Sequence, residues 1–107
     1  MKVADRFRQI ALCASALVQK FSCQPDGTRI DRAVNLLRKG SEELAEWSEQ
    51  AGEIPQMKLE HKLSPVLLQV HSTFDRARVL YEEADKSEEG ALIWDVEQQI
   101  YRLLNDL

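Results

Sequence analysis

Two groups of carboxylates are the residues of this sequence whose spacing suits chemistry. Residues 42–46 read Glu-Glu-Leu-Ala-Glu, and residues 82–85 read Glu-Glu-Ala-Asp. On a helix, a spacing of three or four residues places two carboxylates on one face. Hard divalent cations such as Mg²⁺ take several oxygen ligands. The set Glu42, Glu43, Glu46, Glu82 and Asp85 is therefore a candidate metal site.

The two acidic motifs resemble those of the all-α nucleoside triphosphate pyrophosphatases of the MazG type, over roughly residues 30–85. In that family a Glu-Glu-x-x-Glu helix and a Glu-x-x-Asp helix hold magnesium against the nucleotide phosphates. The resemblance implies a Mg²⁺-dependent pyrophosphatase. The chain departs from the family at Lys62 and Pro65, which stand where the second helix carries its acids. Glu82 and Asp85 come a whole helix later.

A solvated acidic face is the competing interpretation of the same carboxylates. At about 100° per residue, Glu42 and Glu46 project almost opposite the apolar stripe of their helix, and only Glu43 flanks it. The two cysteines and two distant histidines give no zinc-binding spacing. We therefore expect a protein without a cofactor and keep the pyrophosphatase as the alternative hypothesis.

The composition limits the class of protein. The 107 residues suit one domain, and 14 Lys and Arg against 18 Asp and Glu give a net charge of −4. This charge argues against a nucleic-acid binder, which needs basic residues on the phosphates. The longest apolar stretch, Ile10 to Val18, is too short to span a bilayer, and because Ser15 breaks it, it is not the uninterrupted stretch that a signal peptide needs. We expect a soluble, cytoplasmic protein that binds no membrane.

Apolar residues recur every three or four positions along four segments, as on amphipathic helices. We expect helices at about 2–22, 28–51, 64–86 and 88–106, packed as an antiparallel up-down four-helix bundle that spans the single domain 1–107. The third helix is predicted to begin at Ser64-Pro65, a capping hydroxyl followed by a proline. The second stripe keeps its phase through Gly40, and a break at that glycine would give five shorter helices instead.

Several apolar residues fall outside these stripes and are candidates for a partner-binding surface. Trp94 and Tyr101 project on the same outer side of the last helix at heptad spacing, and both residue types are enriched at binding hot spots. The outward residues on the other helices are Leu12, Leu68 and Val79. A wide core that covers all five is the competing interpretation.

The longest expected connection, residues 52–63, also carries apolar residues. This stretch carries Ile54, and in an extended conformation Met57, Leu59, His61 and Leu63 alternate with charged or polar residues and form one apolar edge. Long loops in compact domains often carry function. The edge either packs on the end of the bundle or docks on a partner.

The remaining reactive residues give no catalytic set. We expect His71 to be a packing or hydrogen-bonding residue at the edge of the core, and Cys13 to be a buried, unreactive thiol. The sequence thus predicts a non-catalytic protein-interaction module. Such a small acidic bundle would act as an inhibitor, adaptor or accessory subunit by docking on a protein partner, and we expect it to form a homodimer.

Overall fold

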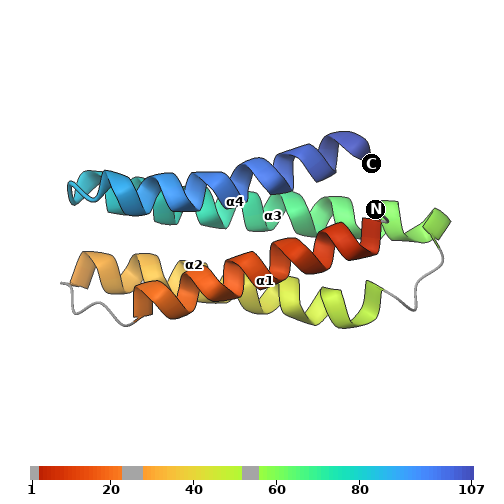
Figure 1. Ribbon diagram of the computed structural model, residues 1–107, viewed down its shortest axis with the longest axis horizontal. Coiled ribbons are helices and arrows are strands. Elements are labelled where there is room, and N and C mark those ends of the chain that lie inside the picture. The colour runs from red at the N-terminus through yellow and green to blue at the C-terminus, as the bar shows by residue number, and fades with distance from the viewer. Residues whose placement is uncertain (1–2, 23–27, 52–55) are drawn as a thin grey trace.

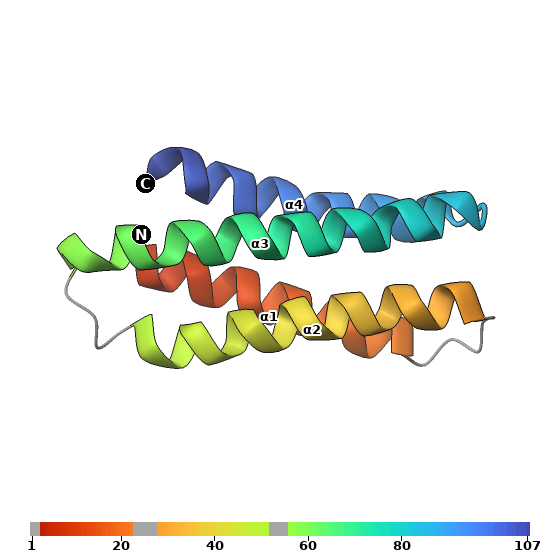
Figure 2. The same ribbon diagram turned by 180° about the vertical axis from the view of Figure 1, so that it is seen from behind.

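The computed structural model describes residues 3–22, 28–51 and 56–107, without the side chains of residues 28–30, 51, 56–57 and 59–60. The described residues form four helices: α1 (Val3–Ser22), α2 (Thr28–Ala51), α3 (Gln56–Glu83) and α4 (Ser87–Asp106). Each helix runs antiparallel to the next along a body of 44 × 22 × 20 Å (Figures 1 and 2). The predicted antiparallel four-helix bundle is confirmed.

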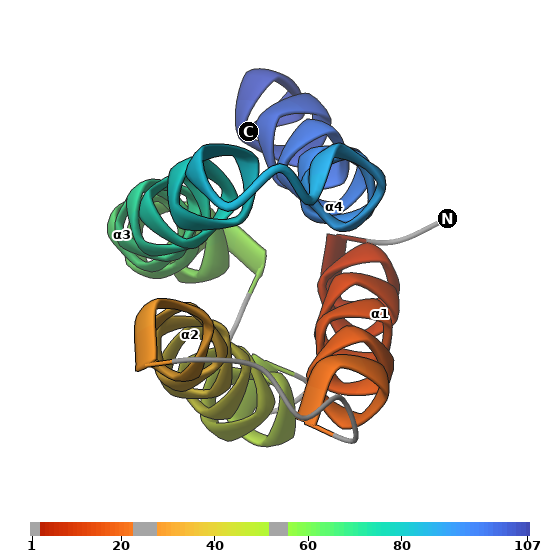
Figure 3. The ribbon, with the colours of Figure 1, turned by 90° about the vertical axis from the view of Figure 1, so that its left-hand side faces the viewer.

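The end-on view shows the four helices at the corners of a square (Figure 3). α1 packs on α2 and α4, and α3 packs on the same two helices from the opposite corner. The seam between α1 and α4 is the least extensive of the four. None of the helices in the described ranges is long and apolar enough to cross a membrane.

The apolar stripe of each helix faces the shared core. The stripes bury Phe7, Ile10, Ala14, Leu17 and Phe21 on α1, Ala33, Leu37 and Leu44 on α2, Leu67, Val70, Phe74, Ala77 and Tyr81 on α3, and Ile93, Val96, Ile100 and Leu103 on α4. The rings of Phe21 and Tyr81 meet in a tilted contact with centroids 5.1 Å apart. The predicted stripes are confirmed, and burial of this apolar surface is the main force that holds the helices together.

α2 runs without a break through Gly40, as its uninterrupted stripe predicts. A Cβ atom at position 40 would lie 2.5 Å from Cε1 of Phe74 and 3.5 Å from Cγ1 of Val70. The glycine therefore allows α2 and α3 to approach closely in the middle of the bundle.

The start of α3 differs from the prediction. The helix begins at Gln56 rather than at residue 64, and Pro65 lies inside it. The apolar stripe continues upstream of the proline, since Leu63 is completely buried. Burial of one leucine contributes about 1.5–3 kcal/mol, which offsets much of the roughly 3 kcal/mol that an interior proline costs a helix. The prediction of an extended stretch at residues 57–63 is therefore wrong, because these residues are helical.

α3 ends in a Schellman motif. The N–H of Lys86 donates to the carbonyl of Tyr81 at 2.9 Å, and the N–H of Asp85 donates to the carbonyl of Glu82 at 3.1 Å. Asp85 adopts the left-handed conformation that this motif requires, with φ 60°. The turn leads directly into α4, whose first turn carries Glu88 and Glu89 at the positive end of the helix dipole.

Candidate protein-binding surface

The five outward residues predicted on the helices are all exposed. The exposed fractions are 70% for Leu12, 61% for Leu68, 38% for Val79, 46% for Trp94 and 53% for Tyr101. The core does not cover them, so the competing interpretation of a wide core does not apply. Exposure alone does not define a site, since more than half of a folded surface is apolar. What matters is which of these residues share a face.

Three of the five gather on the outer face of α3 and α4. Arg78 of α3 contacts Trp94 of α4, which shows which residues of these antiparallel helices lie at the same level. Tyr101 comes seven residues after Trp94, so it lies about 10 Å further along and level with His71. Leu68 is exposed seven residues before Asp75, which puts the two residues on the same outer side of α3. We call Leu68, Arg78, Trp94 and Tyr101 the α3–α4 face.

Arg78 holds Trp94 in place on this face. The guanidinium carbon lies 5.3 Å from the centroid of the Trp94 ring, which is a cation–π contact. The same guanidinium donates from Nη2 to Oδ1 of Asp75 at 2.7 Å and from Nη1 to Oε1 of Glu82 at 2.8 Å. Because these bonds fix the planar group, the surface that it offers to the indole is fixed as well. Trp94 therefore has a defined contact on one face of its ring, while almost half of the side chain remains exposed.

A fully buried carboxyl, Glu97, lies beneath the α3–α4 face. Its Oε2 is 3.3 Å from Nε of Arg78, and its Oε1 is 3.8 Å from Nε2 of His71. Neither oxygen accepts a hydrogen bond of good geometry within the described residues. Burial, and next the neighbouring carboxyl of Asp75, raise the pKa of Glu97 to about 8 against the opposing attraction of Arg78.

Asp75 titrates in the opposite direction. Its hydrogen bonds from Arg78 lower the pKa of Asp75 below its ordinary value. At neutral pH the cluster therefore pairs an ionised Asp75 and a cationic Arg78 with a Glu97 that retains its proton. A protonated carboxyl avoids much of the free-energy penalty of burying a charge.

Sequence analysis missed this cluster. The feature of the sequence that indicates the cluster is the position of Glu97 at the edge of the buried stripe. Glu97 directly follows Val96 and precedes Ile100 by one turn. A carboxyl at such a position needs a partner. That Asp75 and Arg78 provide the partners depends on the register of α3 against α4, which neither helix reveals alone.

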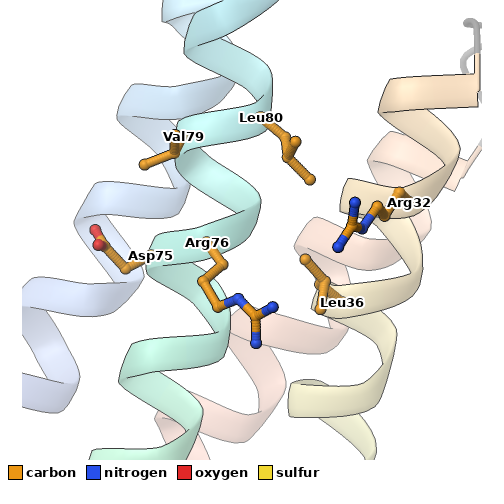
Figure 4. Close-up of a pocket in the computed structure, with 6 residues that line it drawn as sticks. All are labelled: Arg32, Leu36, Asp75, Arg76, Val79 and Leu80. Atoms are coloured by element: carbon orange, nitrogen blue, oxygen red, sulfur yellow. The ribbon is translucent and has the colours of Figure 1, made fainter.

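Val79 lies at a different place, in a groove between α2 and α3. The groove has a volume of about 240 Å³ and is lined by Arg32, Leu36, Asp75, Arg76, Val79 and Leu80. Arg32 and Arg76 extend from opposite helices into the space between them, whereas Asp75 points away toward α4 (Figure 4). We call this the α2–α3 groove.

The structure does not bring the remaining predicted residues to either surface. Leu12 points directly away from the core on α1, remote from α3. Its neighbour Cys13 is exposed, not buried as expected, on a helix whose seam with α4 is short. Ile54 and the side chains of Met57 and Leu59 lie outside the described residues.

The five carboxylates of the alternative hypothesis do not converge within the chain. Since Gly40 lies against Phe74, residues 42–46 of α2 run away from the end of α3. At 1.5 Å per residue, they lie about 15–30 Å from Glu82 and Asp85 along the bundle axis. Glu82 accepts a hydrogen bond from Arg78 instead. No group of three or more His, Cys, Asp and Glu side chains in the described ranges is arranged to hold a metal ion.

The comparisons with known proteins give no match: no family model, no curated protein and no solved structure is similar to this chain. The arrangement of its own residues is therefore the basis for a functional proposal.

Proposed function

We propose that this chain is a non-catalytic protein-interaction module that docks on a protein partner through the α3–α4 face. The observation that carries the proposal is the pair Trp94 and Tyr101, each about half exposed, on one side of α4. Trp, Tyr and Arg are the residue types most enriched at binding hot spots. The α3–α4 face combines all three types.

The contact that holds Trp94 in the unbound protein supports the same proposal. An interface residue that is already fixed loses less conformational entropy when a partner binds. Arg78 fixes Trp94 in this way, and the ion pairs to Asp75 and Glu82 fix Arg78. The net charge of −4 would favour encounter with a basic partner.

We further propose that a second copy of the chain is one occupant of this face, which gives a homodimer. A two-fold interface needs only one self-complementary patch on each copy. A cytoplasmic inhibitor, adaptor or accessory subunit is the role that such a small bundle would serve. The partner would then bind the same face in place of the second copy, or bind another face of the dimer.

The test is the double variant Trp94→Ala/Tyr101→Ala. We expect unchanged helix content by circular dichroism and a loss of self-association by sedimentation velocity. In-cell photo-cross-linking from position 98, between the two aromatics, should give partner adducts that the double variant lacks. Leu12→Ala is the matched control, since it removes an exposed apolar side chain elsewhere on the bundle. Unchanged association and unchanged adducts in the double variant would refute the proposal.

A further inference from the structure

The α2–α3 groove combines an apolar floor with two arginines. Leu36 of α2 and Leu80 of α3 form the floor, Val79 lines its rim, and Arg32 and Arg76 stand beside it. Gly40 sets the register of the antiparallel pair, so Arg32 lies near the level of Leu80, and Arg76 near the level of Leu36. The two arginines are therefore diagonal across the groove and offset by about 6 Å along its length.

Neither arginine is neutralised within the part of the chain that the structure describes. The one carboxylate that lines the groove, Asp75, points away from it and is bonded to Arg78. Arg32 and Arg76 make no ion pair or side-chain hydrogen bond with another described residue. Arg32 and Arg76 therefore give the groove a local positive charge in a protein whose net charge is −4.

We propose that the α2–α3 groove binds an amphipathic helix of a partner protein, with acidic residues on both flanks of the apolar stripe of that helix. One or two apolar side chains of the helix would pack on Leu36 and Leu80. Its carboxylates would pair with Arg32 on one side and with Arg76 on the other. Apolar stripes with charges on both flanks are how helices recognise one another in coiled coils.

The size of the groove favours a helix over a small molecule. Sites that enclose a small ligand usually measure about 300–1,000 Å³, and a cavity of 240 Å³ is smaller and open. It suits the side chains of a helix that lies along it. Diagonal arginines also match charges on the two flanks of such a helix better than they match one compact anion.

A second copy of the chain is a poorer occupant. Its helices bury their apolar stripes in their own core. The exposed pair Trp94 and Tyr101 has Asp95 on one flank, but Glu97 on the other flank is buried. The folded chain therefore does not present carboxylates on both sides of an exposed stripe on α4.

The inference shares with the proposed function only the idea that the chain docks on protein, since it concerns a different surface. The test selects binders to the wild-type protein from a displayed library of helical peptides of about 18 residues, which is five turns. Binding of the selected peptides is then measured by fluorescence anisotropy against four variants: Arg32→Glu, Arg76→Glu, the double variant, and the matched control Arg8→Glu. Arg8 is an exposed arginine on α1, away from the groove.

We expect the selected peptides to carry Asp or Glu on both flanks of an apolar stripe. Each single reversal should weaken binding about tenfold or more, and the double reversal should abolish it. Peptides with Lys in place of the acids should bind the double variant, because the charges are then complementary again. Binding should also fall with added salt, while Arg8→Glu and Trp94→Ala/Tyr101→Ala leave it unchanged.

Four outcomes would overturn the inference. The selection enriches no peptide, or it enriches peptides that lack flanking acids. The selected peptides bind the double variant as tightly as they bind the wild type, or the wild type forms oligomers that disappear on Arg32→Glu/Arg76→Glu. The last result would identify a second copy as the occupant. Because the double variant retains the α3–α4 face, its loss of peptide binding is distinguishable from a failure of the proposed function.

Discussion

Arg78 and Trp94 meet across the seam between α3 and α4, with the guanidinium carbon 5.3 Å from the centroid of the indole ring. The same arginine lies 3.3 Å from the buried carboxyl of Glu97. One side chain thus serves both an exposed aromatic residue and a buried acid. This double contact links the stability of the bundle to the shape of its candidate binding surface.

Replacement of Arg78 tests this link. We expect Arg78→Ala to destabilise the protein by about 1–2 kcal/mol, because Asp75 and Glu82 lose their ion pairs and the Trp94 ring loses its cation. Trp94 should lose its fixed position, and its fluorescence should shift to longer wavelength. Arg78→Lys should recover part of the stability but not the stacking, since an ammonium lacks the planar fork. The emission is measured in a Trp47→Phe background, with Arg8→Ala as control. Unchanged emission in Arg78→Ala would contradict the assignment.

The raised pKa of Glu97 predicts that the free energy of unfolding falls as the pH rises. Its pKa is about 8 in the folded chain against an ordinary value of 4.5, so the folded state favours the protonated form. The unfolding free energy is therefore highest when Glu97 is protonated in both states. It decreases through the window from 4.5 to about 8, by on the order of 3 kcal/mol between pH 5 and pH 8.

The substitution Glu97→Gln should flatten this profile, because a neutral amide cannot ionise. Urea unfolding followed by circular dichroism at pH 5, 6.5 and 8 measures the difference. The lowered pKa of Asp75 acts in the opposite sense, and its stabilisation is lost only as the pH falls below the ordinary value of 3.8. Glu46→Gln on the exposed face of α2 is the control. Parallel profiles for wild type and Glu97→Gln would show that Glu97 ionises freely.

The close contact of α2 and α3 at Gly40 predicts that even a methyl side chain at this position destabilises the protein. A Cβ atom there would lie 2.5 Å and 2.9 Å from two ring atoms of Phe74, which is fully buried and cannot move away. We expect Gly40→Ala to cost about 1–3 kcal/mol despite the better helix propensity of alanine. Phe74→Leu in the same chain should recover part of that loss.

Gly90→Ala is the matched control for thermal unfolding. Its Cβ atom would lie 3.1 Å from Cγ of Glu82, an exposed side chain that can shift at the small cost of weakening its surface ion pair with Arg78. This variant should be neutral or slightly more stable. Equal melting temperatures for the two alanine variants would contradict the close approach of α2 and α3.

Pro65 distinguishes the observed α3 from the shorter helix that the sequence predicts. Inside a helix, proline removes one backbone hydrogen bond and is about 3 kcal/mol less favourable than alanine. Pro65→Ala should therefore stabilise the protein and slow amide exchange at residues 61–64. If the helix began at Ser64, the proline would occupy its favoured first position, and alanine would be neutral or destabilising. Ser72→Ala, on the exposed side of the same helix, is the control.

The fold followed from the sequence because each stripe of buried residues repeats at the helical period. The phase of the stripe through Gly40 predicts a continuous α2, and the outward projection of Trp94 and Tyr101 predicts their exposure. The start of α3 could not be predicted from the sequence, because the local start signal at Ser64-Pro65 competes with the burial of Leu63. Tertiary packing decides between the two, and a local motif carries no information about it.

The candidate site could be predicted from the sequence only in part, for a related physical reason. Projection onto a single helix shows which residues point outward, but not what faces them from the next helix. The contact of Arg78 with Trp94 and Glu97 depends on the register between α3 and α4. That register is set by the packing of the whole core. The groove between Arg32 and Arg76 depends likewise on the approach of α2 and α3 at Gly40.

The salt bridge between Arg6 and Asp106, at 2.7 Å, joins the beginning of α1 to the end of α4. Both ends of the described chain therefore lie at the same end of the bundle (Figure 1). Trp94 is thirteen residues from Leu107, which corresponds to about 20 Å along α4. The α2–α3 groove lies in the same distant half, beside the last turns of α3. An attachment at either terminus would thus act as a handle that keeps Trp94 and the α2–α3 groove at a distance from whatever the chain is anchored to.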